Sequence, residues 1–221
     1  MMETIKTFAA PHKALRKIMS EFLVLAGQTN FKNKEAIENL KKTGNEMFML
    51  LTSHAHSEDS VVLSLLESKL PGAAEHDTSD HIKIEQLQHE LEVHLNRLNT
   101  SVSETEAHDF YLEFASFFGL YLEHIEEEET VTQKLIWENL TLEEQAGIHV
   151  TIVSKMDPDT YMIWMRHMIP AQNETENIAI LGAIRQIMPA ERFEKLMQIL
   201  EENMEENAFN ALEHKLTAGV V

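Results

Sequence analysis

The chain has 221 residues, of which 43% are hydrophobic, and with only 7 Gly and 5 Pro it is typical of a helical globular protein of one large or two small domains. Its formal net charge of −19 opposes binding to nucleic acid or to an anionic membrane, because no patch of Lys and Arg offsets it. The sequence contains no Cys, so any metal ion must be held by nitrogen and oxygen ligands rather than by thiolates.

Four long amphipathic patterns predict four helices in the first part of the chain. Pro11 is tolerated in the first turn of the first helix, Pro71 and Gly72 end the second, and Ser103 with Glu106 forms a capping box for the fourth. The predicted helices span residues 10–26, 33–70, 77–98 and 103–137. Short connections between long helices favour an all-α, up-down-up-down four-helix bundle, so we predict a first domain at 1–139.

The second and fourth predicted helices each contain a His followed four residues later by a Glu: His54 with Glu58, and His124 with Glu128. Residues four apart lie one above the other on a helix, so each pair offers an imidazole nitrogen and a carboxylate oxygen to one point. Both pairs interrupt apolar stripes predicted to face the core, namely Met47, Leu51, His54, Glu58, Val61, Leu65 and Phe117, Tyr121, His124, Glu128, Val131, Leu135. Because a buried, unpaired carboxylate is costly, the pattern predicts a cation between these helices.

The first and third predicted helices add His12 and His81 to their own apolar stripes. Measured from the turns at about 1.5 Å per residue, His81 and His124 fall at nearly one level, and His12 and His54 differ by less than two helical turns. The second and fourth helices of such a bundle are parallel and diagonal, so Glu58 and Glu128 are expected to face each other. This arrangement suits two carboxylates that bridge a pair of metal ions, with the His residues closing the site.

Four segments together resemble the ligand-bearing helices of the hemerythrin-like (HHE, cation-binding) family. They read PHKALR at 11–16, HAHSEDSVVLSLLE at 54–67, DHIKIEQL at 80–87 and HIEEEE at 124–129. The resemblance extends over about residues 8–137 and implies a non-haem di-iron centre, that is, two Fe ions. The residues that it implies are the terminal ligands His12, His54, His81 and His124 and the bridges Glu58 and Glu128.

The chain departs from the oxygen-carrying members of that family at two places. Those proteins have a second His one turn after the His of the third helix, where this chain has Glu85. Their fourth-helix bridge is an Asp five residues after its His, whereas here Glu128 follows His124 by four. The departures favour the bacterial di-iron stress and repair members and the eukaryotic iron-sensing members over a simple oxygen carrier. If Glu85 points inward, it is a possible additional ligand, and its charge would favour fast autoxidation over reversible oxygen binding.

Several neighbours of the candidate ligands have two interpretations each. Tyr121, one turn before His124, either hydrogen-bonds an oxygen ligand of the centre or is plain core. Asp59 and Glu129 either accept hydrogen bonds from ligand imidazoles or are exposed. His76 is expected in a loop before the third helix, with an extra ligand as the alternative.

The last part of the chain, residues 140–221, is predicted to form a C-terminal helical extension. Its helical patterns lie at about 142–154, 158–169, 174–187 and 190–215. Its His residues lack metal-ligand spacing, and its Met and aromatic residues favour a packing or oligomer surface. The extension resembles the tails of longer bacterial hemerythrin-like proteins, and we expect it to cover the bundle or to form a homodimer.

These patterns, with the resemblance, predict a non-haem di-iron protein that binds or reacts with oxygen, nitric oxide or peroxide in sensing, stress defence or iron–sulfur centre repair. The alternative is a non-catalytic iron-binding or cation-binding module that stabilises the fold or reports the iron level. A ferroxidase or substrate-oxidising enzyme and a metal-free structural protein are further alternatives. Without a signal-type apolar core or a run of about 18 apolar residues, the chain is expected to be soluble and cytoplasmic, with no membrane partner.

Overall fold

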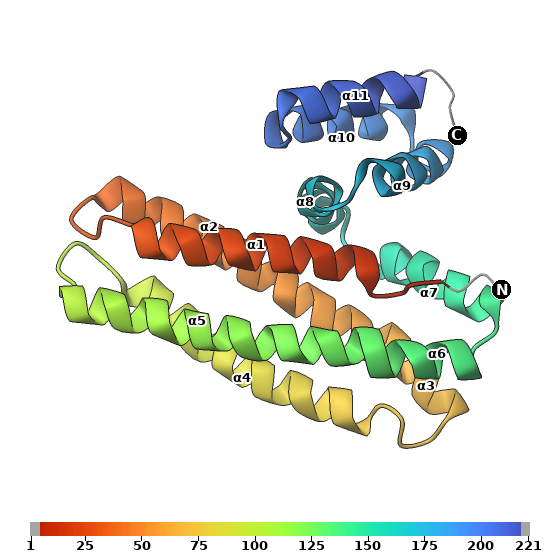
Figure 1. The fold of residues 1–221 in the computed structure, drawn as a ribbon, viewed down its shortest axis with the longest axis horizontal. Helices are drawn as coiled ribbons and strands as arrows, with labels where there is room; N and C mark the ends of the chain where they lie inside the picture. The colour runs from red at the N-terminus through yellow and green to blue at the C-terminus, as the bar shows by residue number, and fades with distance from the viewer. Residues whose placement is uncertain (1–4, 218–221) are drawn as a thin grey trace. The chain divides into compact units, whose positions relative to one another are not determined.

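The computed structural model describes residues 5–217, which form helices joined by turns and contain no strand. Figure 1 shows these helices in chain order. The chain divides into two compact units, residues 1–155 and 156–221. The predicted all-α fold is confirmed. None of the helices in the described part of the chain is long and apolar enough to cross a membrane.

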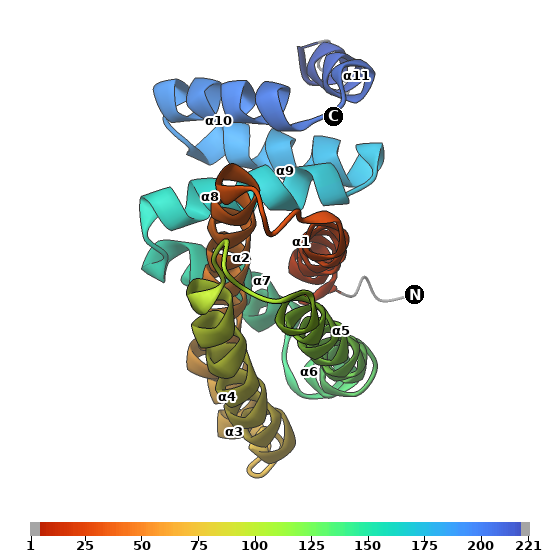
Figure 2. The same cartoon turned by 90° about the vertical axis from the view of Figure 1, so that its left-hand side faces the viewer.

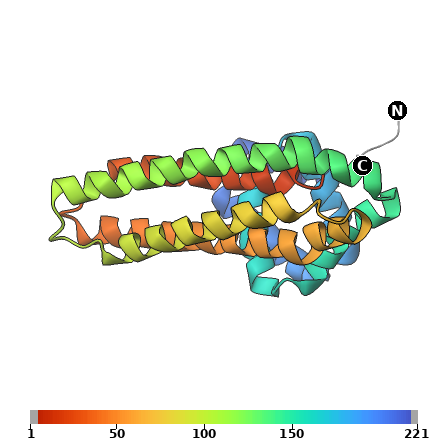
Figure 3. The ribbon, with the colours of Figure 1, turned by 90° about the horizontal axis from the view of Figure 1, so that it is seen from below.

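The first unit is a four-helix bundle. Its long helices are α1 (Ala9–Gln28), α2 (Lys34–Ser57), α4 (Glu75–Arg97) and α5 (Glu104–Glu127). Helices α1 and α4 each pack against both α2 and α5, so α1 lies diagonal to α4 and α2 diagonal to α5, as the end-on view in Figure 2 shows. The α1–α2 and α4–α5 turns lie at the same end of the bundle (Figure 3), which confirms the up-down-up-down order.

The end of the bundle that carries these turns has an aromatic core. The ring of Phe22 contacts the rings of Phe48, Phe110 and Phe114 with centroid separations of 6.3, 6.4 and 4.7 Å. Gly44 allows the helices to approach here, because a Cβ at this position would lie 2.5 Å from Leu95 Cδ2. This end of the core is apolar, and the predicted ligands lie in the other half of the bundle.

Both helices that carry a His–Glu pair contain a π-helical segment that begins at the Glu. Helix α2 continues through η1 (Glu58–Leu63) into α3 (Ser64–Lys69), and α5 continues through η2 (Glu128–Thr132) into α6 (Gln133–Asn139). The i→i+5 bonds of a π segment accommodate extra residues within the turn, so the side chains that follow it are rotated relative to a regular α-helix.

This rotation corrects the apolar stripes predicted from the sequence. Val131, predicted to face the core, is 50% exposed, and its neighbour Thr132 is buried instead. In the other helix Leu66 is fully buried, whereas Leu65 is only partly buried. The predicted stripe is therefore wrong at Val131, whereas Val61 is buried as predicted and Leu65 and Leu135 are only partly buried. The prediction assumed uninterrupted α-helical geometry, which the π segments do not follow.

The end of the bundle opposite the α1–α2 and α4–α5 turns is closed by an apolar cluster that includes α7 (Leu142–Lys155). Its buried members are Phe8, Val61, Val62, Leu66, Ile136, Leu140 and Ile148. The chain before α1 is tied to α6, because Thr7 N donates to Gln133 Oε1 at 2.7 Å and Trp137 Nε1 donates to Ile5 O at 2.8 Å. Since Ile148 belongs to this cluster, α7 packs with the bundle, and the first unit extends beyond the boundary predicted at residue 139.

The second unit consists of α8 (Pro158–Met168), η3 (Ile169–Ala171), α9 (Glu174–Ile187), α10 (Ala190–Asn203) and α11 (Glu206–Thr217). The long helix predicted at 190–215 is broken after Asn203, where Met204 is extended. The break lets α11 pack against α9 and α10 and bury Phe209 and Leu212. The expectation that this region covers the bundle or forms a homodimer stays a prediction.

Candidate metal centre

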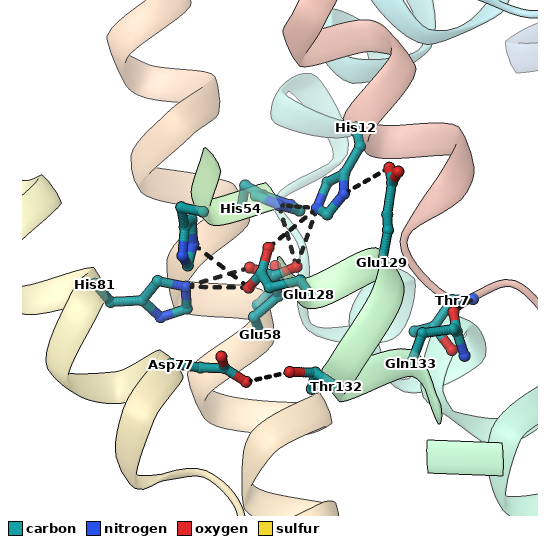
Figure 4. Close-up of polar contacts among 12 residues, drawn as sticks. Thr7, His12, His54, Glu58, Asp77, His81, Glu128, Glu129, Thr132 and Gln133 are labelled. Atoms are coloured by element: carbon teal, nitrogen blue, oxygen red, sulfur yellow. Dashed lines mark hydrogen bonds and ion pairs between the residues drawn. The ribbon is translucent and has the colours of Figure 1, made fainter. Parts of the chain in front are cut away.

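All six predicted ligands lie together inside the bundle, and none is more than 6% exposed. Figure 4 shows five of them by label, approaching one another from different helices. Four of the six offer ligand atoms within 4.8 Å of one another, and so does a second group that shares Glu128 with the first. The first group is His12, His54, Glu58 and Glu128, and the second is His81, His124 and Glu128.

The carboxylate of Glu58 reaches both groups with different oxygens. Its Oε1 lies 3.6 Å from His12 Nε2 and 3.1 Å from His54 Nε2. Its Oε2 lies 3.5 Å from His81 Nε2. Glu58 therefore directs one oxygen to the His12–His54 pair and the other to the opposite side.

Glu128 repeats this geometry from the diagonal helix. Its Oε2 lies 3.4 Å from His12 Nε2, and its Oε1 lies 3.4 Å from His81 Nε2 and 3.5 Å from His124 Nε2. Each Glu thus presents one oxygen to each pair of imidazoles. Both carboxylates therefore reach both pairs of imidazoles.

The polar atoms at the centre are placed to bind a cation rather than to hydrogen-bond with one another. All four carboxylate oxygens of Glu58 and Glu128 are buried, and so is His81 Nε2, yet none makes a hydrogen bond of acceptable geometry within the protein. The Nε2 atoms of His12 and His54 are only 3.0 Å apart. Buried carboxylates without hydrogen bonds are strongly unfavourable, so the side chains fit a cation-binding role. With imidazole and carboxylate as the donors, the site fits a metal such as iron.

Two acids outside the centre orient the imidazoles. The Nδ1–H of His12 donates to Glu129 Oε1 at 3.0 Å, and the Nδ1–H of His81 donates to Asp59 Oδ1 at 2.8 Å. These hydrogen bonds direct both Nε2 atoms inward and make the imidazoles better ligands. They confirm the interpretation of Asp59 and Glu129 as hydrogen-bond acceptors.

Arg16 completes the outer contacts on one side, and its role was not predicted from the sequence. Its Nη1 donates to Glu129 Oε1 at 2.7 Å, and its Nη2 donates to Glu129 Oε2 at 3.2 Å. These two hydrogen bonds fix the carboxylate of Glu129, which in turn orients His12. The only sequence signal was the position of Arg16 one turn after His12.

The electric field of the centre favours positive charge. Burial lowers the pKa of His12, but Glu128, Glu129 and Glu58 outweigh burial and raise it to about 10. Burial likewise lowers the pKa of His81, and Glu128, Glu58 and Asp59 raise it to about 11. The raised pKa values of His12 and His81 mean that the surrounding carboxylates attract positive charge.

The other two imidazoles are biased towards the neutral form. Burial lowers the pKa of His54 well below its usual value, and the charge of His12 lowers it further. Burial also lowers the pKa of His124. A neutral imidazole is the form that binds a metal ion, so these two side chains are suited to act as ligands.

Tyr121 lies beside the centre, one helical turn before His124. Its ring is buried, and its centroid lies 6.0 Å from that of His124. Burial and the charges of Glu58 and Glu128 raise its pKa well above 10, so Tyr121 remains a neutral phenol. A hydrogen bond from Tyr121 to an oxygen ligand of the centre stays a prediction.

Glu85 does not face the centre. It is exposed, whereas α4 buries His81, Ile84 and Gln88. The hypothesis that Glu85 coordinates or neutralises an iron is therefore wrong, because the buried stripe of α4 continues through residues three and seven positions after His81. The fast autoxidation expected from Glu85 loses its structural basis with it.

His76 lies in the first turn of α4, not in the loop where we expected it. Its Nε2 lies 3.0 Å from Glu127 Oε1 and 3.6 Å from Asp80 Oδ2. The side chain of His76 is 59% exposed, and the contacts with Glu127 and Asp80 raise its pKa. His76 therefore takes part in a surface ion-pair network rather than in the buried centre.

A buried polar pair near the centre was also not predicted from the sequence. The hydroxyl of Thr132 donates to Asp77 Oδ2 at 2.7 Å, and each of these two residues is only 3% exposed. Figure 4 shows the pair below His81. Asp77 stands one turn before His81 in the sequence, but no sequence signal placed Thr132 inside, because the π segment η2 turns it there.

The fold and the site together define a helical-bundle protein with a buried histidine and glutamate site that fits a cation. The chain matches the family model of the hemerythrin HHE cation binding domain over residues 3–136. Because this match covers more than half of the sequence, the chain belongs to the hemerythrin HHE cation-binding domain family. A search of the curated proteins gives no match.

Proposed function

We propose that this protein holds two iron ions and binds or reacts with a small ligand, namely oxygen, nitric oxide or peroxide. The observation that carries the proposal is the placement of Glu58 and Glu128, each of which directs one oxygen to each pair of imidazoles. One carboxylate oxygen on each side suits two ions rather than one. Imidazole and carboxylate donors in a chain without Cys suit non-haem iron.

Each half of the centre would hold one ion. His12 and His54 supply the nitrogen donors of one half, His81 and His124 supply those of the other, and both carboxylates contribute to each half. Two nitrogen and two oxygen donors leave coordination positions for a further ligand, and the iron pair would supply its redox chemistry there. Asp59 and Glu129 orient the imidazoles, and the buried surroundings exclude water.

The biological context that we propose is sensing, stress defence or iron–sulfur centre repair, in the cytoplasm. The support is chemical: an iron pair held by buried ligands is suited to diatomic gases and peroxide rather than to a large substrate. The burial of all six ligands, none more than 6% exposed, agrees with a ligand of this size.

The same burial favours a second function, that of a non-catalytic iron-binding or cation-binding module. A closed site whose imidazoles are fixed by outer hydrogen bonds can retain its metal and stabilise the fold without reacting further. The two functions differ in whether a bound iron pair responds to small ligands.

Metal analysis and optical spectra of freshly purified, iron-grown protein test both functions. We expect about two iron ions per chain and a spectrum that changes when the reduced protein meets oxygen, nitric oxide or hydrogen peroxide. A stoichiometry near one, or a strong preference for zinc, would contradict the di-iron proposal. Two irons that do not respond to any of these ligands would instead support the cation-binding module.

A further inference from the structure

The two halves of the centre repeat one structural plan. The π segment η1 carries Glu58 and then Asp59, which accepts a hydrogen bond from His81 of the other half. The segment η2 carries Glu128 and then Glu129, which accepts one from His12. Each π segment therefore supplies a central carboxylate and, at the next residue, the acid that holds a His across the bundle.

This repetition makes positions in the two halves comparable, and one half is sealed by apolar side chains. Phe8 stands four residues before His12, and Val62 stands four residues after Glu58. The ring of Phe8 stacks on the ring of His12, with centroids 5.4 Å apart and planes 16° apart. Phe8 and Val62 are both 1% exposed. Because both side chains are apolar, they offer no hydrogen bond to a ligand.

The equivalent positions of the other half carry a polar pair. Asp77 stands four residues before His81, and Thr132 stands four residues after Glu128. The Thr132 hydroxyl and the Asp77 carboxyl are joined by a hydrogen bond of 2.7 Å in the protein interior. Burying this pair costs more than burying its apolar counterpart, so its presence on one side only requires an explanation beyond packing.

We propose that Asp77 and Thr132 form a polar subsite for the small ligand of the metal pair, on the side of His81 and His124. In this subsite Asp77 is a neutral acid that donates a hydrogen bond to the ligand, and Thr132 orients the Asp77 carboxyl. The inference rests on the proposed di-iron function and names the side on which the ligand binds. The ligand class is a small anion or oxygen-terminated molecule, which accepts such a hydrogen bond.

The surroundings of Asp77 raise the pKa of its carboxyl group and so favour the neutral form more than water does. Burial raises its pKa, and the charge of Glu128 on η2 raises it further, whereas the hydrogen bond from Thr132 and the charges of His81 and His76 on α4 lower it, with a net shift upward. A neutral carboxyl has an O–H donor, whereas an ionised carboxylate only accepts. Only the neutral form can therefore donate a hydrogen bond to a bound ligand.

Azide binding to the oxidised, iron-loaded protein tests the subsite, with absorbance as the readout. The variant Asp77→Leu should weaken azide binding about tenfold or more, because it removes a buried hydrogen bond. Asp77→Asn retains an N–H donor and should stay within about threefold of the unmodified protein. Thr132→Val, which removes only the hydroxyl, should weaken binding about threefold to tenfold.

The matched control is the position equivalent to Thr132 in the other half, Val62→Thr. This variant should leave azide binding within about threefold, because the proposed ligand lies on the opposite side. Iron content is measured first for every variant, so that a failure to load metal is not mistaken for a failure to bind azide. If Asp77→Leu does not load iron, the Asp77→Asn and Thr132→Val variants decide.

The outcomes separate this inference from the proposed function. Unmodified protein that holds fewer than two irons contradicts the di-iron function itself. With two irons in place, the inference is overturned by the absence of azide binding, by unchanged binding in Asp77→Leu and Thr132→Val, or by an equal loss in Val62→Thr. Tighter binding in Asp77→Asn would show that Asp77 is an anion that repels the ligand, and a loss as large as in Asp77→Leu would contradict donation by Asp77.

Discussion

The half of the centre that contains His12 and the half that contains His81 use the same ligand types, but their surroundings differ. The acid that orients His12 is Glu129, which Arg16 holds through two hydrogen bonds. The acid that orients His81 is Asp59, whose side chain is 38% exposed. The ring of Phe8, four residues before His12, stacks on His12, whereas the equivalent position four residues before His81 carries the buried Asp77.

The comparison shows that a repeated set of His and Glu side chains need not have equivalent surroundings. The hydrogen bonds around a ligand tune its basicity and orientation, and the polarity of its neighbours decides which small molecules are tolerated nearby. The first half is fixed by an ion pair and an apolar ring. The second half is less firmly held and offers polar contacts, so we expect metal retention to depend more on the first and ligand binding more on the second.

The largest expected effect comes from the residues that both halves share. Glu58→Ala and Glu128→Ala should each abolish the two-ion stoichiometry, because each carboxylate presents an oxygen to both pairs of imidazoles. Iron analysis of each variant measures the effect. Glu127→Ala is the control, since Glu127 pairs with His76 at the surface. Two ions in either bridge variant would refute a shared bridge.

The outer acids should have a smaller effect, and an unequal one. Glu129→Ala and Asp59→Ala should each lower metal affinity about tenfold to a hundredfold, which is typical when the hydrogen-bond partner of a ligand His is lost. The loss should be larger for Glu129, because its removal also leaves Arg16 without this partner. Chelator competition measures both affinities.

The exposed Glu126→Ala is the control for the outer acids, because it changes the charge of the same helix without contacting a ligand imidazole. It should leave metal affinity unchanged. A larger loss for Asp59 than for Glu129 would reverse the assignment of the more firmly held half.

The smallest expected effect concerns stability and compares Thr132 with its counterpart Val62. Thr132→Val should destabilise the protein by about 1–3 kcal/mol, because buried Asp77 loses its hydrogen-bond donor. Val62→Thr should cost a similar amount, about 1–3 kcal/mol, because it buries a hydroxyl in the apolar cluster. Urea unfolding of the two variants measures both costs. A Thr132→Val protein as stable as the original would mean that the Asp77–Thr132 bond contributes nothing to stability.

The helices and the six candidate ligands were predictable because each follows from a short-range pattern. Asn33 and Ser103 begin α2 and α5 through side-chain caps, and Pro71 follows the end of α3. The pair His54 and Glu58 is recognisable from its four-residue spacing on an apolar face, because a helix places residues four apart on the same side. Glu85 failed the same reasoning, because a residue four positions from a ligand faces the core only where the buried stripe passes through it.

The sequence by itself determined the all-α bundle, the depth of the His residues and the pairing of each His with a Glu, since helical periodicity depends only on local spacing. Only the tertiary structure decided which residues surround them. The π segments η1 and η2 shift the positions that follow Glu58 and Glu128, and no local pattern marks that shift. Arg16 with Glu129, and Asp77 with Thr132, join residues on different helices that are far apart in the sequence. The asymmetry of the centre therefore arises from packing between helices, which local sequence patterns do not encode.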